Sequence, residues 1–486
     1  MSSKEAAMAH GKPLHELGAL EVAELLATGE LTSEALVDHL LARITAREPT
    51  LHALIAIHPQ ALEQARAADA RWASGHPLSP LDGVPVIIKD NIECLGLPGT
   101  VGSLAMVGSP AQRDAALVVR LRAAGLVVLA AANLSEWANF RGRLSTSGWS
   151  AVGGLTDNPW VSGRSAGGSS SGSGAALAAG YAPLAVGTET DGSITCPASL
   201  CGVVGLKPTV GVVPVEGVAP IAASHDAPGP MARSVADVGA LLAVLSGRHH
   251  GSHDDSERGS PRRFVLGVPS AWLAGDAATD TVFSGSVDAI RAAGMTVVDV
   301  EVAAADDQSA RDEVSVLVHE MADDLDGYLL SRPGSGPSSI AALVEFNSDH
   351  VAEELAHYGQ EYFEAAVTSG GRAAPEYAAA RARNLDWALG SVLCPAFAHG
   401  VDALISPAYG PAGRSQLAGG DSFTGGLVTS APAIAGWPIL TLPMGLVDGL
   451  PVGLSIVGPE HGEDAVLAIG SAVEAALGWS QHPPEG

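Results

Sequence analysis

Residues 84–131 decide the fold class, because strand-like and helix-like runs alternate there: VPVII (84–88), DAALVVRLRAAG (114–125) and LVVLAA (126–131). The two outer runs are apolar and typical of buried strands, and the run between them has the amphipathic period of a helix. A strand, a helix and a second strand in this order are typical of a βαβ unit. The sequence therefore predicts an α/β fold with a central mixed, largely parallel β-sheet that helices cover on both faces.

The same alternation continues outward from this unit. Two stretches, residues 1–75 and 305–398, instead have only helical periodicity. Thr32 and Ser33 are candidate helix caps in the first of them. We therefore predict an N-terminal helical leader packed on the core (1–75), an α/β core (76–304), a helical insertion (305–398) and a C-terminal part of the core (399–486). The further strand-like runs are PLAVG (183–187), GVVGL (202–206), FVLGV (264–268), MTVVDV (295–300), VDALISP (401–407), PILTLP (438–443) and VGLSIVG (452–458).

Composition excludes several classes of function for these 486 residues. Hydrophobic residues make up 47% and charged residues 16%, and no apolar run approaches the ~18 residues of a membrane span, so we expect a soluble globular protein. The formal charge of −27 disfavours binding to nucleic acid or to an anionic membrane surface. The N-terminus lacks the apolar core of a secretory signal, which predicts a cytoplasmic protein.

No cofactor or metal site is predicted. The four cysteines, Cys94, Cys196, Cys201 and Cys394, have neither a zinc-type spacing nor the density of a disulfide framework, so we expect free thiols. The stretch HHGSHDDSERGSPRR (249–263) holds histidines and aspartates, but without ligand spacing, and is interpreted as a solvated loop.

Lysine is rare in this chain. Only four of the 26 basic residues are lysines, and one of them, Lys89, ends the apolar run VPVII. A buried lysine can lose its proton whereas an arginine cannot, so Lys89 is a candidate base. The alternative is a lysine that extends its charged end to the surface.

The segment SGRSAGGSSSGSGAALAAG (162–180) runs into an alanine-rich helix. It is either a flexible linker or a site in which hydroxyls and backbone N–H groups gather at a helix start. A phosphate-binding loop is excluded, because Ser173 and Gly174 follow the second glycine where Lys and Ser/Thr are required. Residues 168–172 match the GxSxG nucleophile elbow around Ser170, but no strand precedes them, as an elbow requires.

In AVGTETDGSITCPASLCGVVGLKPT (185–209) an apolar strand runs into a turn that ends at Ser193. This is either a connecting loop or a nucleophile turn whose consecutive backbone N–H groups form an oxyanion hole.

Together these segments resemble the amidase signature family of serine hydrolases. Lys89 lies in the family's GVPxxxKD context, Ser169 is the first serine after paired glycines, and Ser193 is the serine of the GT(D/E)xxGS turn. The resemblance continues through ANLSEWANFRG (132–142), PGPMARSVADV (228–238) and the closing run 438–458, so that it covers most of the chain.

The resemblance implies a Ser, cis-Ser, Lys triad. Lys89 would be the base, Ser169 the middle serine on a cis peptide bond, and Ser193 the nucleophile that forms an acyl-enzyme. The backbone N–H groups of Thr190, Asp191, Gly192 and Ser193 would form the oxyanion hole. A lysine base must be neutral, which predicts an alkaline optimum at roughly pH 8 to 9.

Several segments are most similar to the peptide amidase branch, which removes the terminal amide of amidated peptides. The chain departs from the family by having Asp191 in place of a glycine, and by lacking an arginine shortly after the nucleophile, where Thr195 and Cys196 stand; this absence points to neutral amides. The segments are NLSEWANFRG (133–142), GWSAVGG (148–154), GTETDGSITCP (187–197), LVEFNSDH (343–350) and YGQEYFE (358–364).

The resemblance thus implies an amidohydrolase of linear, neutral amides, whose substrate is a small-molecule or peptide amide: the C-terminal amide of a peptide or an aryl or acyl amide. The helical insertion would shape the substrate pocket, with Trp137, Phe140 and Trp149 as candidate wall residues. A urethane or carbamate hydrolase is the main alternative. Lesser alternatives are an esterase with Ser170 as nucleophile and the A-type subunit of an amidotransferase. We expect no nucleic-acid or membrane partner, and a monomer or homodimer.

Overall fold

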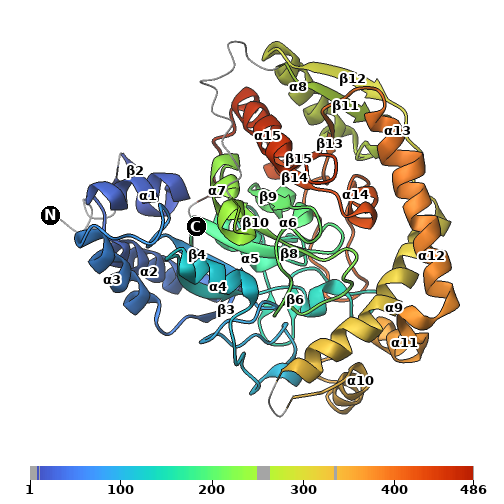
Figure 1. Ribbon diagram of the computed structural model, residues 1–486, viewed down its shortest axis with the longest axis horizontal. Coiled ribbons are helices and arrows are strands. Elements are labelled where there is room, and N and C mark those ends of the chain that lie inside the picture. Colours follow the sequence, from blue (N-terminus) through green and yellow to red (C-terminus); the bar gives the residue numbers. More distant parts are fainter. Residues whose placement is uncertain (1–7, 10, 249–262, 333–335, 485–486) are drawn as a thin grey trace.

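The computed structural model of the protein describes residues 8–9, 11–248, 263–332 and 336–484. Its centre is an eleven-stranded sheet with the strand order β12-β11-β13-β15-β14-β9-β10-β8-β4-β5-β3 (Figure 1). These strands are β3 (Leu54–Ile57), β4 (Pro85–Lys89), β5 (Val127–Ala132), β8 (Leu184–Glu189), β9 (Val204–Lys207), β10 (Ala227–Ala232), β11 (Val265–Pro269), β12 (Thr296–Val300), β13 (Ala403–Pro407), β14 (Ile439–Val447) and β15 (Leu450–Val457). Two short hairpins complete the β-structure, β1 (Met8–Ala9) with β2 (Lys12–Pro13) and β6 (Trp149–Ser150) with β7 (Gly154–Leu155).

The helices surround this sheet. They are α1 (Ala19–Thr28), α2 (Ser33–Leu51), α3 (Ala61–Ala73), α4 (Ala116–Ala123), α5 (Ser171–Ala178), α6 (Thr195–Cys201), α7 (Val235–Ser246), α8 (Ala277–Ala292), α9 (Asp307–Ser331), α10 (Ile340–Asp349), α11 (Glu361–Ser369), α12 (Pro375–Leu385), α13 (Cys394–Phe397), α14 (Ser430–Ala435) and α15 (Glu463–Leu477). A π-helical stretch, Asp386–Leu393, joins α12 to α13. Within the described residues, no helix has both the length and the apolar character that a membrane crossing requires.

The predicted mixed α/β sheet is confirmed, with less parallel pairing than the sequence indicated. Parallel pairs lie in two places, β5-β4-β8 and β12-β11-β13, and the first of these includes the βαβ unit of residues 84–131. The remaining pairs are antiparallel. One cause is the tight hairpin between β14 and β15, where Asp448 and Gly449 both have positive φ, as an Asp-Gly hairpin turn requires.

Strand β10 was not predicted, because its sequence APGPMA contains two prolines and proline cannot donate to a ladder. The strand nevertheless lies inside the sheet, between β8 and β9. It pairs with β8 along its whole length, but with β9 only through Met231 and Ala232, beyond both prolines. The limited second ladder explains how the prolines are accommodated.

The N-terminal segment is less purely helical than the sequence indicated. Thr32 caps α2 as predicted, accepting a hydrogen bond from Ala35 N. Residues 54–57, however, form β3, which pairs with β5 at the edge of the main sheet. The leader therefore contributes a strand to the core, and its boundary at residue 75 stays a prediction, as do the other segment boundaries.

Helices cover both faces of the sheet. Adjacent residues of a strand point to opposite faces, and β14 shows this at Leu440 and Thr441. Leu440 faces Gly470 of α15, whereas Thr441 lies on the face where Gly453 N of β15 donates to Ser199 Oγ of α6. Helices α5 and α6 pack together on the second face, and α7, α8 and α15 pack on the first.

Helix α9 brings a second apolar cluster against the core. Its residues Leu317, Met321 and Leu325 pack with Trp137 and Phe140 of the segment 133–142. Arg141 of this segment is fully buried and pairs with Glu136 of the same segment and with Glu354, which lies between α10 and α11. Helices α11 and α12 pack on α9, and α9 forms a wall beside the segment 133–142.

Candidate active site

Strand β4 carries Lys89 at its end, and the side chain is fully buried. Its Nζ lies 2.7 Å from Ser169 Oγ, 2.9 Å from Thr188 Oγ1 and 3.3 Å from Thr188 O. Because β4 and β8 pair in parallel, their ends meet at one edge of the sheet, where Lys89 reaches Thr188. Lys89 is therefore not a surface lysine.

Burial lowers the pKa of Lys89 to about 7, against the smaller upward effect of the carboxylates Asp226 and Glu189. The neutral amine is thus well populated near neutral pH. It retains a lone pair toward the hydroxyl of Ser169, while its N–H groups can donate to the two oxygens of Thr188. This arrangement can accept a proton.

Ser169 lies in the loop that leads into α5, and the Gly168–Ser169 peptide bond is cis. A side chain at Gly168 would collide with Ser135 Oγ, so the loop needs glycine there. Ser169 is fully buried, and its carbonyl accepts a hydrogen bond from Ser135 N at 3.1 Å. The next residue ties the loop to the nucleophile turn, because Ser170 N donates to Ser193 O at 3.0 Å.

The predicted oxyanion turn lies between β8 and α6. In the part of the chain that the structure describes, the N–H groups of all four predicted residues, Thr190, Asp191, Gly192 and Ser193, have no acceptor within the protein. Gly192 has a φ of +78°, and a side chain there would collide with the hydroxyl of Tyr409. Free, consecutive N–H groups in a rigid turn are what stabilisation of an oxyanion requires.

Two carboxylates fix this turn at its two ends. Glu189 accepts hydrogen bonds from Ile194 N (2.7 Å) and Thr195 N (2.8 Å), which follow Ser193. Asp226 accepts from Thr190 Oγ1 at 2.6 Å. Glu189 is buried and Asp226 is partly buried, and desolvation raises the pKa of Asp226 to about 7.

Ser193 opens onto a cavity of about 350 Å³. Its walls come from the segment 138–147, the oxyanion turn, helix α9 and the segment 409–423. The lining residues are Ala138, Asn139, Phe140, Ser147, Gly168, Thr190, Asp191, Gly192, Ser193, Cys196, Ile221, Glu313, Val314, Leu317, Tyr409, Asp421 and Phe423.

Of the three aromatic residues predicted as pocket walls, Phe140 lines this cavity and the two tryptophans do not. Trp137 packs edge-on against Phe363 in the cluster around α9. Trp149 packs edge-on against Tyr358 and His357. Both indole rings are buried in these contacts, Trp137 against α11 and Trp149 against residues 357–358 between α10 and α11.

The structure disfavours the alternative nucleophile Ser170. Its hydroxyl donates to Thr188 O at 3.1 Å and accepts from Thr188 N at 3.2 Å, and the residue is fully buried. No strand leads directly into α5, as an elbow would need. Ser170 instead joins the α5 loop to strand β8.

Sequence reasoning did not select four residues that surround the predicted triad. Asn91, two residues after Lys89, donates to Thr188 Oγ1 at 3.0 Å, so its proximity in sequence was a signal. Thr188 and Glu189 lie within the quoted turn segment. Asp226 follows a loop 33 residues after Ser193, and no pattern in the sequence pointed to it.

Among the described residues, no group of three or more His, Cys, Asp or Glu side chains could hold a metal ion. The histidine-rich stretch 249–262 lies outside the described residues. All four cysteines are free, and burial raises the pKa of Cys196, next to the cavity, well above its usual range.

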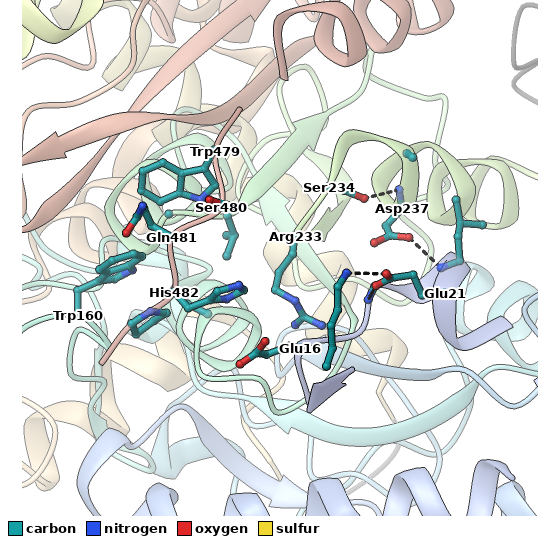
Figure 2. A pocket seen from close by; sticks show the side chains of 18 residues that line it. Glu16, Glu21, Trp160, Arg233, Ser234, Asp237, Trp479, Ser480, Gln481 and His482 are labelled. Atoms are coloured by element: carbon teal, nitrogen blue, oxygen red, sulfur yellow. Dashed lines mark hydrogen bonds and ion pairs between the residues drawn. The ribbon is translucent and has the colours of Figure 1, made fainter. Parts of the chain in front are cut away.

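A second cavity, of about 530 Å³, lies where the N-terminal segment, the start of α7 and residues 479–483 meet (Figure 2). Its aromatic side is formed by Trp160 and Trp479, and its charged side by Glu16, Glu21 and Arg233. The Arg233 guanidinium donates to the carbonyls of Leu17, Leu177 and Ala182, which anchors the N-terminal segment. No residue of the predicted triad lines this cavity.

Comparison with known proteins agrees with this geometry. A sequence model of the amidase family matches residues 35–467. The A-type subunit of glutamyl-tRNA(Gln) amidotransferase from Salinispora arenicola is 33% identical over 96% of this chain and 98% of its own length. Its counterpart from Roseiflexus castenholzii is 33% identical over 97% of this chain and 98% of its own length.

Two solved structures are similar over almost the whole chain. The native peptide amidase of Stenotrophomonas maltophilia has a TM-score of 0.88 and 38% identity, covering 96% of this chain and 98% of that one. A peptide amidase bound to the competitive inhibitor chymostatin has a TM-score of 0.90 and 39% identity, covering 97% of this chain and 99% of that one.

Proposed function

The chain belongs to the amidase family, whose members act on amide C–N bonds, and we propose that it hydrolyses neutral carboxylic amides, with the C-terminal amide of peptides as its main substrate class. The observation that carries the chemistry is the contact of 2.7 Å between buried Lys89 Nζ and Ser169 Oγ. The loop that carries Ser169 is hydrogen-bonded to the turn that ends at Ser193, the proposed nucleophile. Ser193 in turn lines the cavity.

The proposed reaction begins with a proton relay. Neutral Lys89 accepts the proton of Ser169 while Ser169 accepts that of Ser193, and Ser193 Oγ attacks the amide carbonyl. The N–H groups of Asp191, Gly192 and Ser193 hold the oxyanion. The relay then returns the proton to the leaving nitrogen as the C–N bond breaks, which releases ammonia from a terminal amide. Water, deprotonated by the same relay, cleaves the acyl ester and releases the carboxylic acid.

Two observations favour the hydrolysis of peptide amides over a role as an amidotransferase subunit that serves transfer RNA. Identity to the two peptide amidase structures is 38% and 39%, against 33% to the two amidotransferase chains over similar lengths. In addition, the formal charge of −27 disfavours approach to a nucleic acid. A urethane or carbamate presents the same planar carbonyl to Ser193, and the cavity offers no feature that separates it from an amide.

A substrate panel with the purified single chain tests this proposal. The panel contains a peptide amide, an anilide, a carbamate and glutamine, with Ser193→Ala as the background. We expect release of ammonia from the peptide amide at a kcat/KM above that for the other three. Turnover of glutamine alone, or activity only after a partner protein is added, would contradict it.

A further inference from the structure

The charged side chains that line the cavity beside Ser193 are an unusual set. Three carboxyl groups line it, Asp191, Glu313 and Asp421, and among the described residues no Lys, Arg or His side chain does. Any charge selection at this site must therefore come from acids. The three acids differ in how many hydrogen bonds they accept from the rest of the protein.

Asp421 has partners within the protein. It accepts hydrogen bonds from Ser147 N at 3.1 and 3.2 Å and from Ser147 Oγ at 2.6 Å. These bonds hold the segment 409–423 against residues 138–147. Asp421 is thus explained as a structural residue of the wall.

Asp191 and Glu313 are not explained in this way. Glu313 lies near the start of α9; its Oε1 is buried, and among the described residues the only group that faces its carboxyl is another acid, Asp191. Asp191 receives one hydrogen bond, from Ser430 Oγ to Oδ2 at 3.0 Å, and its Oδ1 is buried without a partner. Buried carboxyl oxygens of this kind are costly unless something binds them.

The two carboxyl groups lie against each other. Burial raises the pKa of Glu313 well above its usual range, and the hydrogen bond and charge of Asp191 raise it further. Asp191 therefore disfavours the charged form of Glu313, and a cation bound between the two carboxyl groups would offset this repulsion.

We propose that Asp191 and Glu313 form a binding site for a positively charged group on the acyl part of the substrate, so that the enzyme prefers cationic amides to anionic ones. This inference rests on the proposed amidase function and names its substrate class. An ammonium or guanidinium would donate to the two buried oxygens that lack a partner. The apolar walls Phe140, Val314 and Leu317 would pack against the alkyl chain that bears the charge.

The pair also accounts for discrimination against acids. A carboxylate side chain in this cavity would face Asp191 and Glu313 with no cation to compensate it. The same repulsion acts on the carboxylate product after hydrolysis and favours its release.

The test measures kcat/KM for three amides of similar length: the α-amides of N-acetyl-lysine, N-acetyl-norleucine and N-acetyl-glutamate. In the wild-type enzyme we expect the lysine amide to exceed the norleucine amide by about tenfold or more, which is the size of one hydrogen bond to a charged group, and the glutamate amide to be the poorest. Glu313→Gln should bring the lysine-to-norleucine ratio close to one.

The matched control is Asp307→Asn, which removes one carboxylate from the same helix at an exposed position outside the cavity. Its ratio should equal that of the wild type, and circular dichroism and the melting temperature establish that each variant is folded. A second variant, Glu313→Arg, should move the preference toward the glutamate amide.

The outcomes separate the two proposals. If the wild type hydrolyses none of the three amides, the proposed function fails. If it hydrolyses the norleucine amide but the lysine-to-norleucine ratio is unaffected by both Glu313 variants, the amidase function stands and the cation site is overturned.

Discussion

The triad region and the α9 wall meet at one cavity, yet they are built differently. Around Lys89, the protein itself supplies the partners, Ser169 and the two oxygens of Thr188. On α9, Glu313 Oε1 is buried, and the group that its carboxyl faces in the described structure is another acid, Asp191. The difference indicates that the first region is complete before substrate binds, whereas the second is completed by the substrate. Chemistry and selectivity are therefore separable by mutation.

The largest effect is expected in the triad region, at the nucleophile. Ser193→Ala removes the attacking oxygen and should lower kcat by about 10⁴- to 10⁶-fold, with little change in substrate binding. Single-turnover kinetics on a peptide amide measure this loss. Ser170→Ala is the neighbouring control and should remain active, because its hydroxyl bonds only to the backbone of Thr188; the reverse pattern would move the nucleophile to Ser170.

A smaller loss of activity is expected at Thr188, which contacts Lys89 but is not part of the predicted triad. Thr188→Val removes the hydroxyl that lies 2.9 Å from Lys89 Nζ and 3.0 Å from Asn91 Nδ2. Loss of a hydrogen bond to a positioned charged group corresponds to about ten- to hundredfold in kcat/KM. This oxygen favours the ammonium form, so its removal should also shift the midpoint of the pH–rate profile to lower pH. A loss of activity with an unchanged midpoint would make Thr188 merely structural.

On the α9 side, changes should alter selectivity rather than chemistry. Leu317→Ala enlarges the cavity wall and should change the ratio of kcat/KM between a bulky and a small peptide amide by about tenfold, as expected for a few methylene groups in an apolar pocket. The kcat on the small amide should stay near that of the wild type. An equal loss on both substrates would mean that α9 supports the chemistry itself.

The smallest effect on activity is expected for Trp149→Ala. This ring packs against Tyr358 and His357 outside the cavity, so its removal should lower the free energy of unfolding by about 3–5 kcal/mol. Denaturant unfolding measures that loss. The selectivity ratio of the folded variant should not change, and a changed ratio would restore Trp149 as a pocket residue.

The difference between the triad region and the α9 wall also explains what the sequence could predict. The βαβ unit and the positions of Lys89, Ser169 and Ser193 were accessible, because the alternating pattern and the motifs are local in sequence. Strand β10 was not, because its prolines conceal a strand that tertiary pairing enforces. Glu313 and Leu317 were also inaccessible, since an amphipathic helix does not reveal which residues will face a cavity formed by loops far away in the chain. For the same reason the sequence offered three aromatic wall residues, of which only Phe140 lines the cavity.

The central claim is that a neutral, buried lysine is the base, and the pH dependence of kcat/KM tests it most directly. The pKa of Lys89 is lowered to about 7, so the active, neutral form is gained as pH rises. The account predicts a rate that rises with a midpoint near 7 and levels off about one pH unit above it, at lower pH than the alkaline optimum expected from the sequence. Lys89→Arg should lack this activity at every pH, because a guanidinium cannot accept a proton. A Lys89→Arg enzyme that retains a comparable rate and the same profile would contradict the account.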